Sequence, residues 1–316
     1  MRRTIRPPDA EWPKGLSEIE PLDPPERLRV DGLPLPTDSP SIAVVGTRTP
    51  TGAGIEIATT LARAFAEAGF AVVSGLAVGI DAVAHRAALE AGGHTVGVLG
   101  GGLDIDYPKA NRDLRRQMEE RGTVVTEYDD DVSPAKFTFP RRNRIIAGLV
   151  QAVVVIEGAI TSGALVTARL ALDANRSVFA VPGSVRNPMA VGPNELIRTS
   201  RAALVTSPSH VFEDLAPSLV WQETDDQPAV SDIGDTELAV LRALDDTPSS
   251  IDRLALLTGL KPGELAVTLS RLEVRSLARR NYGGYEITSA GARTRCHSAK
   301  SGGLGHSGSG EGPSRT

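Results

Sequence analysis

The fold of this chain is decided by residues 41–74, which read SIAVVGTRTPTGAGIEIATTLARAFAEAGFAVVS. Two short apolar runs, 42–46 and 70–73, enclose an alanine-rich stretch from 52 to 68. A strand, a helix and a second strand in this order form the βαβ unit of a parallel sheet. Both runs lack the alternation of apolar and polar residues, which is typical of strands that helices cover on two faces. The sequence therefore predicts an α/β fold.

The same alternation of helices and strands continues to about residue 181. Further helices are expected at 78–91, 111–121 and 162–174. Further strands are expected at 94–99, 123–126, 152–156 and 177–181. This order predicts a doubly wound, mostly parallel sheet.

The two ends of the chain differ from this pattern. Nine prolines in residues 1–40 predict a proline-rich N-terminal arm with no long helix and no central strand. The sheet domain is expected at 41–216 and a polar linker at 217–233. Residues 234–292 contain three amphipathic helices and two short strands, the order of a small winged-helix domain. The Gly- and Ser-rich residues 293–316 are expected to be a disordered tail.

Composition limits the classes of protein to consider. The 316 residues carry 34 Lys and Arg against 39 Asp and Glu, and this net charge of −5 argues against a protein that coats nucleic acid over its whole surface. A single cysteine excludes an intramolecular disulfide and a cysteine-rich zinc site. The N-terminal residues contain no apolar signal region and the apolar runs are only strand-sized. We therefore expect a cytoplasmic protein without membrane insertion.

Four predicted strands end in small or polar residues before the next helix. These turns are Gly46–Arg48, Ser74–Gly79, Gly100–Gly102 and Thr161–Gly163. Because the carboxyl ends of parallel strands share one edge, the turns should converge on a single crevice. Glycine lets backbone N–H groups approach a ligand, and helix N-termini favour an anion, so a phosphate-bearing ligand is expected. For any single turn, the alternative that glycine serves only tight geometry remains open.

Residues 137–144, FTFPRRNR, are the segment most typical of polymer binding. They contain three arginines and two phenylalanines, in a chain with only 12 aromatic residues. Arginine offers paired donors to phosphate oxygens, and an aromatic face stacks on an unpaired base, so single-stranded nucleic acid fits this segment. Arg48 adds a fourth cation at the same crevice, and a helix is expected from Ile145 onward. The alternative is that Phe139 is a core residue and the arginines pair with acids at 129–131.

Signals for catalysis are weak. Asp81 and His85 share one helix face, but an acid in a first turn is favoured by the helix dipole, so a structural role is preferred. Glu157 follows a strand and could act as a base, which one carboxylate alone does not establish. There is no nucleophile elbow, dinucleotide fingerprint, P-loop or histidine cluster. We therefore expect no enzyme activity, no metal and no cofactor.

Six motifs follow one another between residues 41 and 215. They are Val45-Gly-Thr-Arg48, Ser74-Gly-Leu-Ala-Val-Gly-Ile-Asp81 with Ala84-His85, Leu99-Gly-Gly-Gly-Leu-Asp104 with Tyr107-Pro108, Phe139-Pro-Arg-Arg-Asn-Arg-Ile-Ile-Ala-Gly148, Ser162-Gly-Ala-Leu-Val-Thr-Ala168, and Val181-Pro-Gly183 with Gly192-Pro-Asn194. In this order they closely resemble the DNA-processing protein A family, also called DprA or Smf. The resemblance implies an extended Rossmann-like domain that binds single-stranded DNA. It further implies protection of incoming strands in natural transformation, loading of the RecA recombinase, a homodimer and no defined enzymatic reaction.

The resemblance also implies which residues bind DNA. Carried over by motif, they are Arg48, Ser74, Gly75, Phe139, Arg141, Arg142, Asn143, Arg144, Ser162 and Gly163. Two other functions remain as alternatives. One is a nucleotide-processing phosphoribohydrolase on a similar fold, although such enzymes carry Pro-Gly-Gly-x-Gly-Thr where this chain has Thr161-Ser-Gly163. The other is a duplex-binding regulator led by the winged helix through Arg271 and Arg275, which residues 221–264 oppose with ten acids against three bases.

Overall fold

The structure is a computed structural model that describes residues 2–19, 22–219, 233–245, 247–281, 283–288, 290–292 and 294–295. The chain divides into two compact units, Met1–Gln222 and Glu223–Thr316. Each unit has its own hydrophobic core, so each is described by itself.

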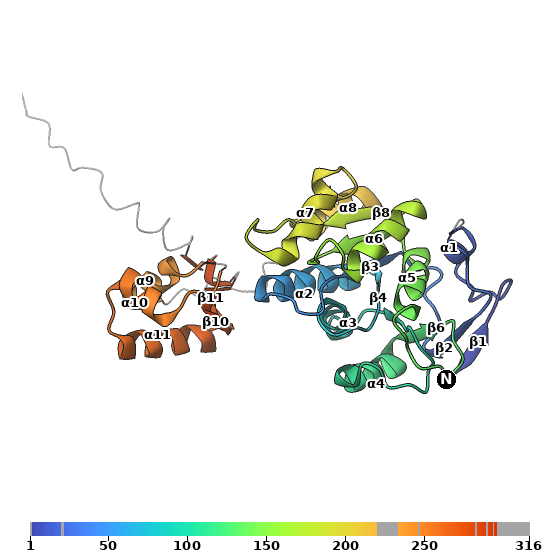
Figure 1. The fold of residues 1–316 in the computed structure, drawn as a ribbon, viewed down its shortest axis with the longest axis horizontal. Coiled ribbons are helices and arrows are strands. Elements are labelled where there is room, and N and C mark those ends of the chain that lie inside the picture. The colour runs from blue at the N-terminus through green and yellow to red at the C-terminus, as the bar shows by residue number, and fades with distance from the viewer. Residues whose placement is uncertain are drawn as a thin grey trace, which may run out of the picture. The chain divides into compact units, whose positions relative to one another are not determined.

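The first unit is built on a nine-stranded sheet with the order β1-β2-β6-β5-β4-β3-β7-β8-β9 (Figure 1). The strands are β1 (Arg3–Ile5), β2 (Leu28–Gly32), β3 (Ser41–Val45), β4 (Ala71–Ser74), β5 (Thr95–Val98), β6 (Thr123–Thr126), β7 (Ala152–Val155), β8 (Ser177–Ala180) and β9 (Ala203–Leu204). The strands from β3 to β9 pair in parallel. Strands β4 to β6 lie on one side of β3 and strands β7 to β9 on the other, so the strand order reverses between β3 and β7. The predicted doubly wound, mostly parallel sheet is confirmed.

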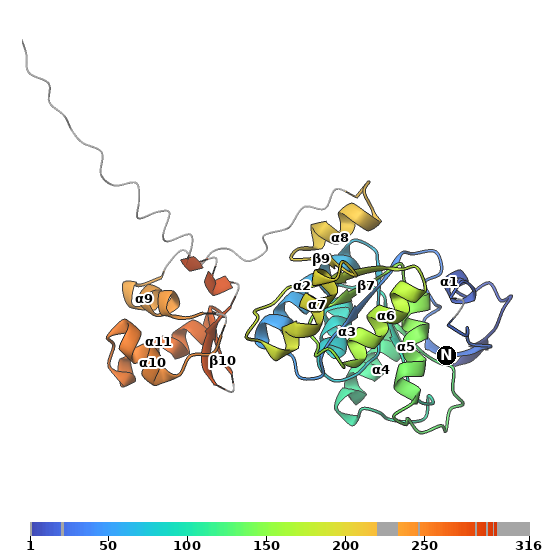
Figure 2. The same cartoon turned by 45° about the horizontal axis from the view of Figure 1, so that its top comes forward.

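Helices cover both faces of this sheet (Figures 1 and 2). One face carries α1 (Lys14–Ser17), α5 (Thr138–Leu149), α6 (Gly163–Asp173) and α7 (Val191–Arg198). The other carries α2 (Gly52–Glu67), α3 (Ile80–Glu90), α4 (Arg112–Arg121) and α8 (Pro208–Leu215). Two short 3₁₀ helices are η1 (Lys109–Asn111) and η2 (Pro188–Ala190). Successive residues of a strand point to opposite faces, so Ala43 belongs to the core on the side of α5 and α6, while Val44 belongs to the core on the side of α2 and α3.

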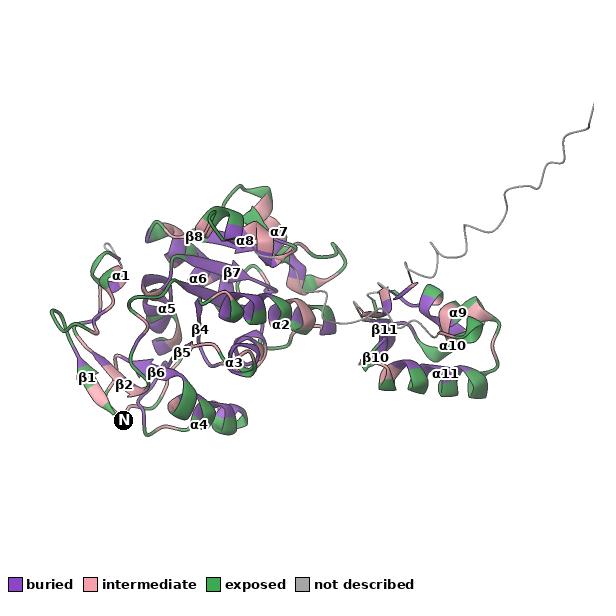
Figure 3. Cartoon of the chain, turned by 180° about the vertical axis from the view of Figure 1, so that it is seen from behind, coloured by how far each residue is buried: buried purple, intermediate pink, exposed green. Residues whose placement is uncertain are grey.

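The core strands are buried throughout, as the purple ribbons of Figure 3 show. This burial explains the continuous apolar runs of the sequence, because no strand face is left to water. In the described part of the chain, none of the helices combines the length and the apolar character that a membrane span requires.

The N-terminal segment differs from the expected extended arm. Strand β2 lies between β1 and β6, where Val30 is paired with Val125. The prolines of this segment all fall outside the two strands, so no backbone donor is missing from the ladder. The buried side chains of Ile5 and Leu28 join the core of the first unit. The expectation that no central strand forms here is therefore wrong.

Among its described residues, the second unit includes three helices and a hairpin. They are α9 (Asp235–Ala243), α10 (Ile251–Thr258), α11 (Pro262–Val274), β10 (Ala278–Asn281) and β11 (Gly284–Ile287). Their core includes Leu254, Leu269 and Tyr285, and their order is that of the predicted winged helix. Most of the expected linker and tail lies outside the described residues, and the domain boundaries stay predictions.

Candidate nucleic-acid interface

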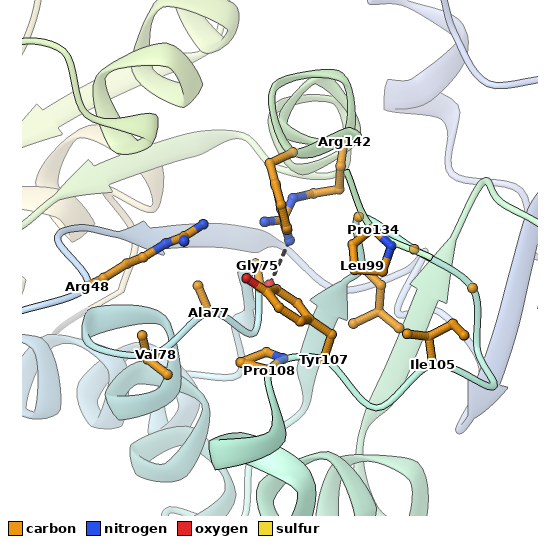
Figure 4. Close-up of a pocket in the computed structure, with 14 residues that line it drawn as sticks. Arg48, Gly75, Ala77, Val78, Leu99, Ile105, Tyr107, Pro108, Pro134 and Arg142 are labelled. Atoms are coloured by element: carbon orange, nitrogen blue, oxygen red, sulfur yellow. Dashed lines mark hydrogen bonds between the residues drawn. The ribbon is translucent and has the colours of Figure 1, made fainter. Parts of the chain in front are cut away.

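A pocket opens at the carboxyl ends of β3, β4 and β5, beside the start of α5 (Figure 4). It is lined by 14 residues: Arg48, Gly75, Ala77, Val78, Leu99, Gly100, Gly101, Gly102, Ile105, Tyr107, Pro108, Pro134, Phe139 and Arg142. Three of the four glycine-bearing turns meet here, as the shared edge of parallel strands requires. We call it the carboxyl-edge pocket.

Arg48 and two aromatic rings form a contact group at this pocket. The guanidinium carbon of Arg48 lies 5.4 Å from the centre of the Phe139 ring, which is a cation–π contact. The ring of Tyr107 lies 5.7 Å from that of Phe139, at an interplanar angle of 41°. Arg48 itself is exposed, and it reaches from the loop after β3 toward Arg142 (Figure 4). The contact group thus presents a positive charge to solvent.

Arg142 holds the walls of the pocket together. Its Nη1 donates a hydrogen bond to the carbonyl oxygen of Gly75 at 2.7 Å and another to that of Val98. The side chain is buried, and this burial lowers the pKa of the guanidinium to about 10 against the opposing effect of Asp81. Arg142 therefore clamps the loop after β4 to the end of β5 while it lines the pocket.

Asp81 and His85 belong to the structure beneath the pocket. The Asp81 carboxylate accepts backbone hydrogen bonds from Gly75 at 3.1 Å and from Ala77 at 3.3 Å. Burial raises its pKa, which the nearby Arg142 opposes. His85 shares a hydrogen bond of 2.7 Å with Thr95, and burial lowers its pKa to about 3. A buried carboxylate that holds a loop and a neutral buried histidine favour the structural role over a catalytic pair.

The basic segment lies inside a helix rather than ahead of one. Helix α5 begins at Thr138, and Pro140 falls in its first turn, where a backbone N–H has no partner within the helix. The expected helix start at Ile145 is therefore wrong. Because the arginines are helical, they point in different directions, and only Arg142 lines the pocket.

The other two arginines of the segment pair with Glu127. Arg144 lies 2.5 Å from a carboxylate oxygen of Glu127 and is buried, whereas Arg141 lies 3.5 Å away with 54% of its side chain exposed. The alternative in which these arginines pair with the acids at 129–131 is therefore wrong. Asp129 and Asp130 instead pair with Arg27 and Arg29 of the N-terminal segment.

The remaining predicted site residues lie outside the pocket and support the turns. The buried Ser74 hydroxyl donates to the carbonyl oxygen of Val44 at 2.7 Å. Ser162 caps the N-terminus of α6, and the Asn143 side chain donates to the carbonyl oxygen of Gly163 at 3.3 Å. Of the ten residues expected to bind DNA, the pocket brings together Arg48, Gly75, Phe139 and Arg142.

Glu157 lies after β7, next to the loop that follows β3. There the buried Glu157 accepts hydrogen bonds from the Thr51 backbone N–H at 2.9 Å, from the Thr51 hydroxyl at 2.7 Å and from Asn187 at 3.0 Å. Its carboxylate lies beside the first turn of α2, where a Cβ added to Gly54 would be 2.5 Å from it. An internal anion thus occupies the helix N-terminus that would otherwise attract a phosphate. Sequence reasoning weighed Glu157 only as a base, and the structure gives it this capping role.

Sequence reasoning also missed part of the pocket wall. Tyr107, Pro108 and Pro134 come from loops between predicted elements, and none was selected as a site residue. Tyr107-Pro108 belonged to one of the recognised motifs, which was the only signal available for it. Among the described residues, no group of three or more His, Cys, Asp or Glu side chains could hold a metal ion.

Comparison with known proteins identifies the family of this chain. The family model of DNA recombination-mediator protein A matches residues 3–216, and that of the DprA winged helix domain matches residues 223–284. The chain belongs to the DNA processing protein A family. The family model already matches from residue 3, which agrees with the structure, where β1 and β2 belong to the same sheet as the later strands.

Individual DprA relatives are similar over most of the chain. Protein Smf of Escherichia coli is 37% identical over 269 residues, which are 83% of this chain and 72% of that protein. The solved structure of DprA from Streptococcus pneumoniae has a TM-score of 0.64 and 40% identity, and the match covers 67% of this chain and 74% of that one. A structure of DprA from Helicobacter pylori, described for its single-stranded DNA binding mode, has a TM-score of 0.62 and 29% identity over 69% of this chain and 97% of that one.

Proposed function

We propose that this DprA protein binds single-stranded DNA at the carboxyl-edge pocket without catalysing a reaction on it. The observation that carries the proposal is that Arg48 and Arg142 line one pocket with the rings of Phe139 and Tyr107. Guanidinium groups bind phosphate oxygens, and aromatic rings stack on unpaired bases. None of the 14 lining residues is acidic, so no side chain of the pocket repels the DNA backbone or offers a carboxylate as base or nucleophile.

The residues expected to bind DNA divide into three groups under this proposal. Arg48 is the exposed phosphate contact, and Arg141 at the start of α5 adds charge through its exposed side chain. Gly75, Phe139 and Arg142 shape the pocket wall. The other five, Ser74, Asn143, Arg144, Ser162 and Gly163, hold the surrounding turns and α5 in place.

The wider role is proposed from the family resemblance. It comprises protection of incoming single strands during natural transformation, promotion of RecA loading, action as a homodimer and location in the cytoplasm. The single-stranded DNA binding described for the Helicobacter pylori relative supports the first element of this role.

Fluorescence anisotropy with a labelled oligonucleotide tests the binding proposal. We expect the protein to bind a single-stranded 12-mer at least about tenfold more tightly than the matching duplex, because paired bases cannot reach an aromatic ring. Arg48→Ala should weaken binding to the single strand several-fold. Arg63→Ala is the matched control, because Arg63 lies near the C-terminal end of α2, away from the carboxyl edge, and pairs with Glu90 at the end of α3. Equal affinity for both DNA forms would contradict the proposal.

The wider role needs its own measurements. The rate at which RecA begins to hydrolyse ATP on single strands coated with single-strand-binding protein should rise when this protein is added. Light scattering after size exclusion should give twice the mass of one chain. An unchanged RecA rate would remove recombinase loading from the proposal, and a monomer mass would remove the homodimer.

A further inference from the structure

The lining of the carboxyl-edge pocket suits a flat, anionic group. Its only charged side chains are those of Arg48 and Arg142. Apart from four glycines, the remaining lining residues are apolar or aromatic. No carboxylate, amide or aliphatic hydroxyl side chain lines the pocket. A nucleotide matches this surface, because its base is flat and its phosphate is negative. No amide or carboxylate side chain of the pocket is present to recognise the edge of the base.

The two rings of the pocket differ in how much surface they offer. One face of Phe139 is covered by the Arg48 guanidinium, and a Cβ added to Gly100 would lie 3.0 Å from the Phe139 ring. Phe139 is therefore packed between its neighbours. Tyr107 is 45% exposed, and its ring extends from the Pro108 side of the pocket toward Gly75 (Figure 4). Tyr107 is therefore the more exposed of the two rings, since Phe139 is only partly exposed.

We propose that Tyr107 is the ring on which one unpaired base of the bound strand stacks. Arg48 contacts the phosphate, and the Phe139 ring lies against both Arg48 and Tyr107. This inference rests on the proposed single-stranded DNA binding and adds the residue that recognises the base. It follows that Tyr107 gives the pocket its preference for single strands, since a base in a duplex is already stacked and paired. Recognition through a ring face also makes the pocket tolerant of base identity.

Two probes of equal charge separate the base from the phosphate. One is a labelled dT 12-mer, and the other is a 12-mer of abasic sites with the same number of phosphates. The parent protein should bind dT more tightly than the abasic strand, and one stacked base accounts for about 5- to 150-fold of that ratio. Tyr107→Leu should reduce the ratio by this factor and leave the affinity for the abasic strand unchanged. Tyr107→Phe keeps the ring and should retain the ratio.

Arg48→Ala provides the opposite pattern. It should weaken binding to both probes by a similar factor, because both carry the same phosphates. Circular dichroism verifies that each variant is folded, and Tyr107→Phe keeps the test decisive if Tyr107→Leu is unstable, since a ratio lost in the phenylalanine variant would overturn the stacking role. A Tyr107→Leu protein that keeps the full ratio would also overturn it. Failure of the parent to bind either probe would instead contradict the proposed function.

Discussion

The Arg142 guanidinium packs directly against Gly75 in the wall of the carboxyl-edge pocket. The Arg142 guanidinium donates to the Gly75 carbonyl oxygen at 2.7 Å, and a Cβ at position 75 would lie 2.5 Å from its nitrogens. Real Cβ atoms do not approach so closely, so a side chain at residue 75 must displace the guanidinium. Glycine is therefore required here for close packing rather than for an unusual backbone conformation.

Gly75→Ala should lower both stability and DNA affinity. Forcing a methyl group against the clamp costs about 1–3 kcal/mol of unfolding free energy, as overpacking usually does. Urea unfolding measures this loss, and anisotropy measures the affinity. Gly163→Ala is the matched control, because a Cβ at position 163 meets nothing within 4 Å. Equal unfolding midpoints for the two variants would show that residue 75 is not constrained by Arg142.

Glu157→Gln should destabilise the sheet unit by about 2 kcal/mol. Both oxygens of Glu157 accept hydrogen bonds, and the amide of glutamine would point an N–H group at one of the donors of Thr51 or Asn187. A buried donor left without an acceptor costs about 1–3 kcal/mol. Urea unfolding should show a lower midpoint, whereas Glu120→Gln on the exposed side of α4 should leave it unchanged. An unchanged midpoint for Glu157→Gln would contradict the capping role.

Acid should destabilise the fold through His85. Its pKa in the folded state is about 3, below the ordinary value of 6.5, so between these values only the unfolded chain binds the proton. Stability is therefore complete above pH 6.5 and falls as the pH decreases, by about 2 kcal/mol at pH 5 from this group alone. In His85→Gln the unfolding free energy should depend less steeply on pH between 6.5 and 5. The same slope in parent and variant would show that His85 does not remain neutral.

The exposed face of α11 predicts weak recognition of duplex DNA. Of the two arginines considered for duplex binding, Arg275 pairs with Glu237 at 2.8 Å. Arg279 on the neighbouring strand β10 pairs with Glu286 at 2.6 Å. Val267 and Val274 are 54% and 87% exposed on α11. Arg271→Ala should therefore change the affinity of the full chain for duplex DNA by less than about twofold in anisotropy titrations. A larger loss would revive the winged helix as a reader of duplex DNA.

The sequence predicted the sheet and the edge at which the pocket lies. Apolar strands followed by glycine-bearing turns leave few other arrangements, because parallel strands bring their carboxyl ends together. This pattern was sufficient to place Arg48 at the crevice that Gly75 shapes.

The directions in which individual side chains point could not be predicted from the sequence. The apolar run from Ile145 suggested a helix start there. Because proline is tolerated in a first turn, α5 begins earlier, includes the arginines and turns Arg144 toward Glu127. The N-terminal prolines likewise concealed β2, which contains none of them. Tyr107 reaches the pocket from a loop, where no periodicity indicates which way a ring points.

The salt dependence of single-strand binding tests the central claim most directly. If Arg48 neutralises a phosphate, the slope of log affinity against log salt for a dT 12-mer should be shallower by about 0.7 in Arg48→Ala than in the parent. Arg63→Ala should keep the parent slope. A parent slope near zero, or an Arg48→Ala slope equal to that of the parent, would contradict the claim that this pocket binds the DNA backbone.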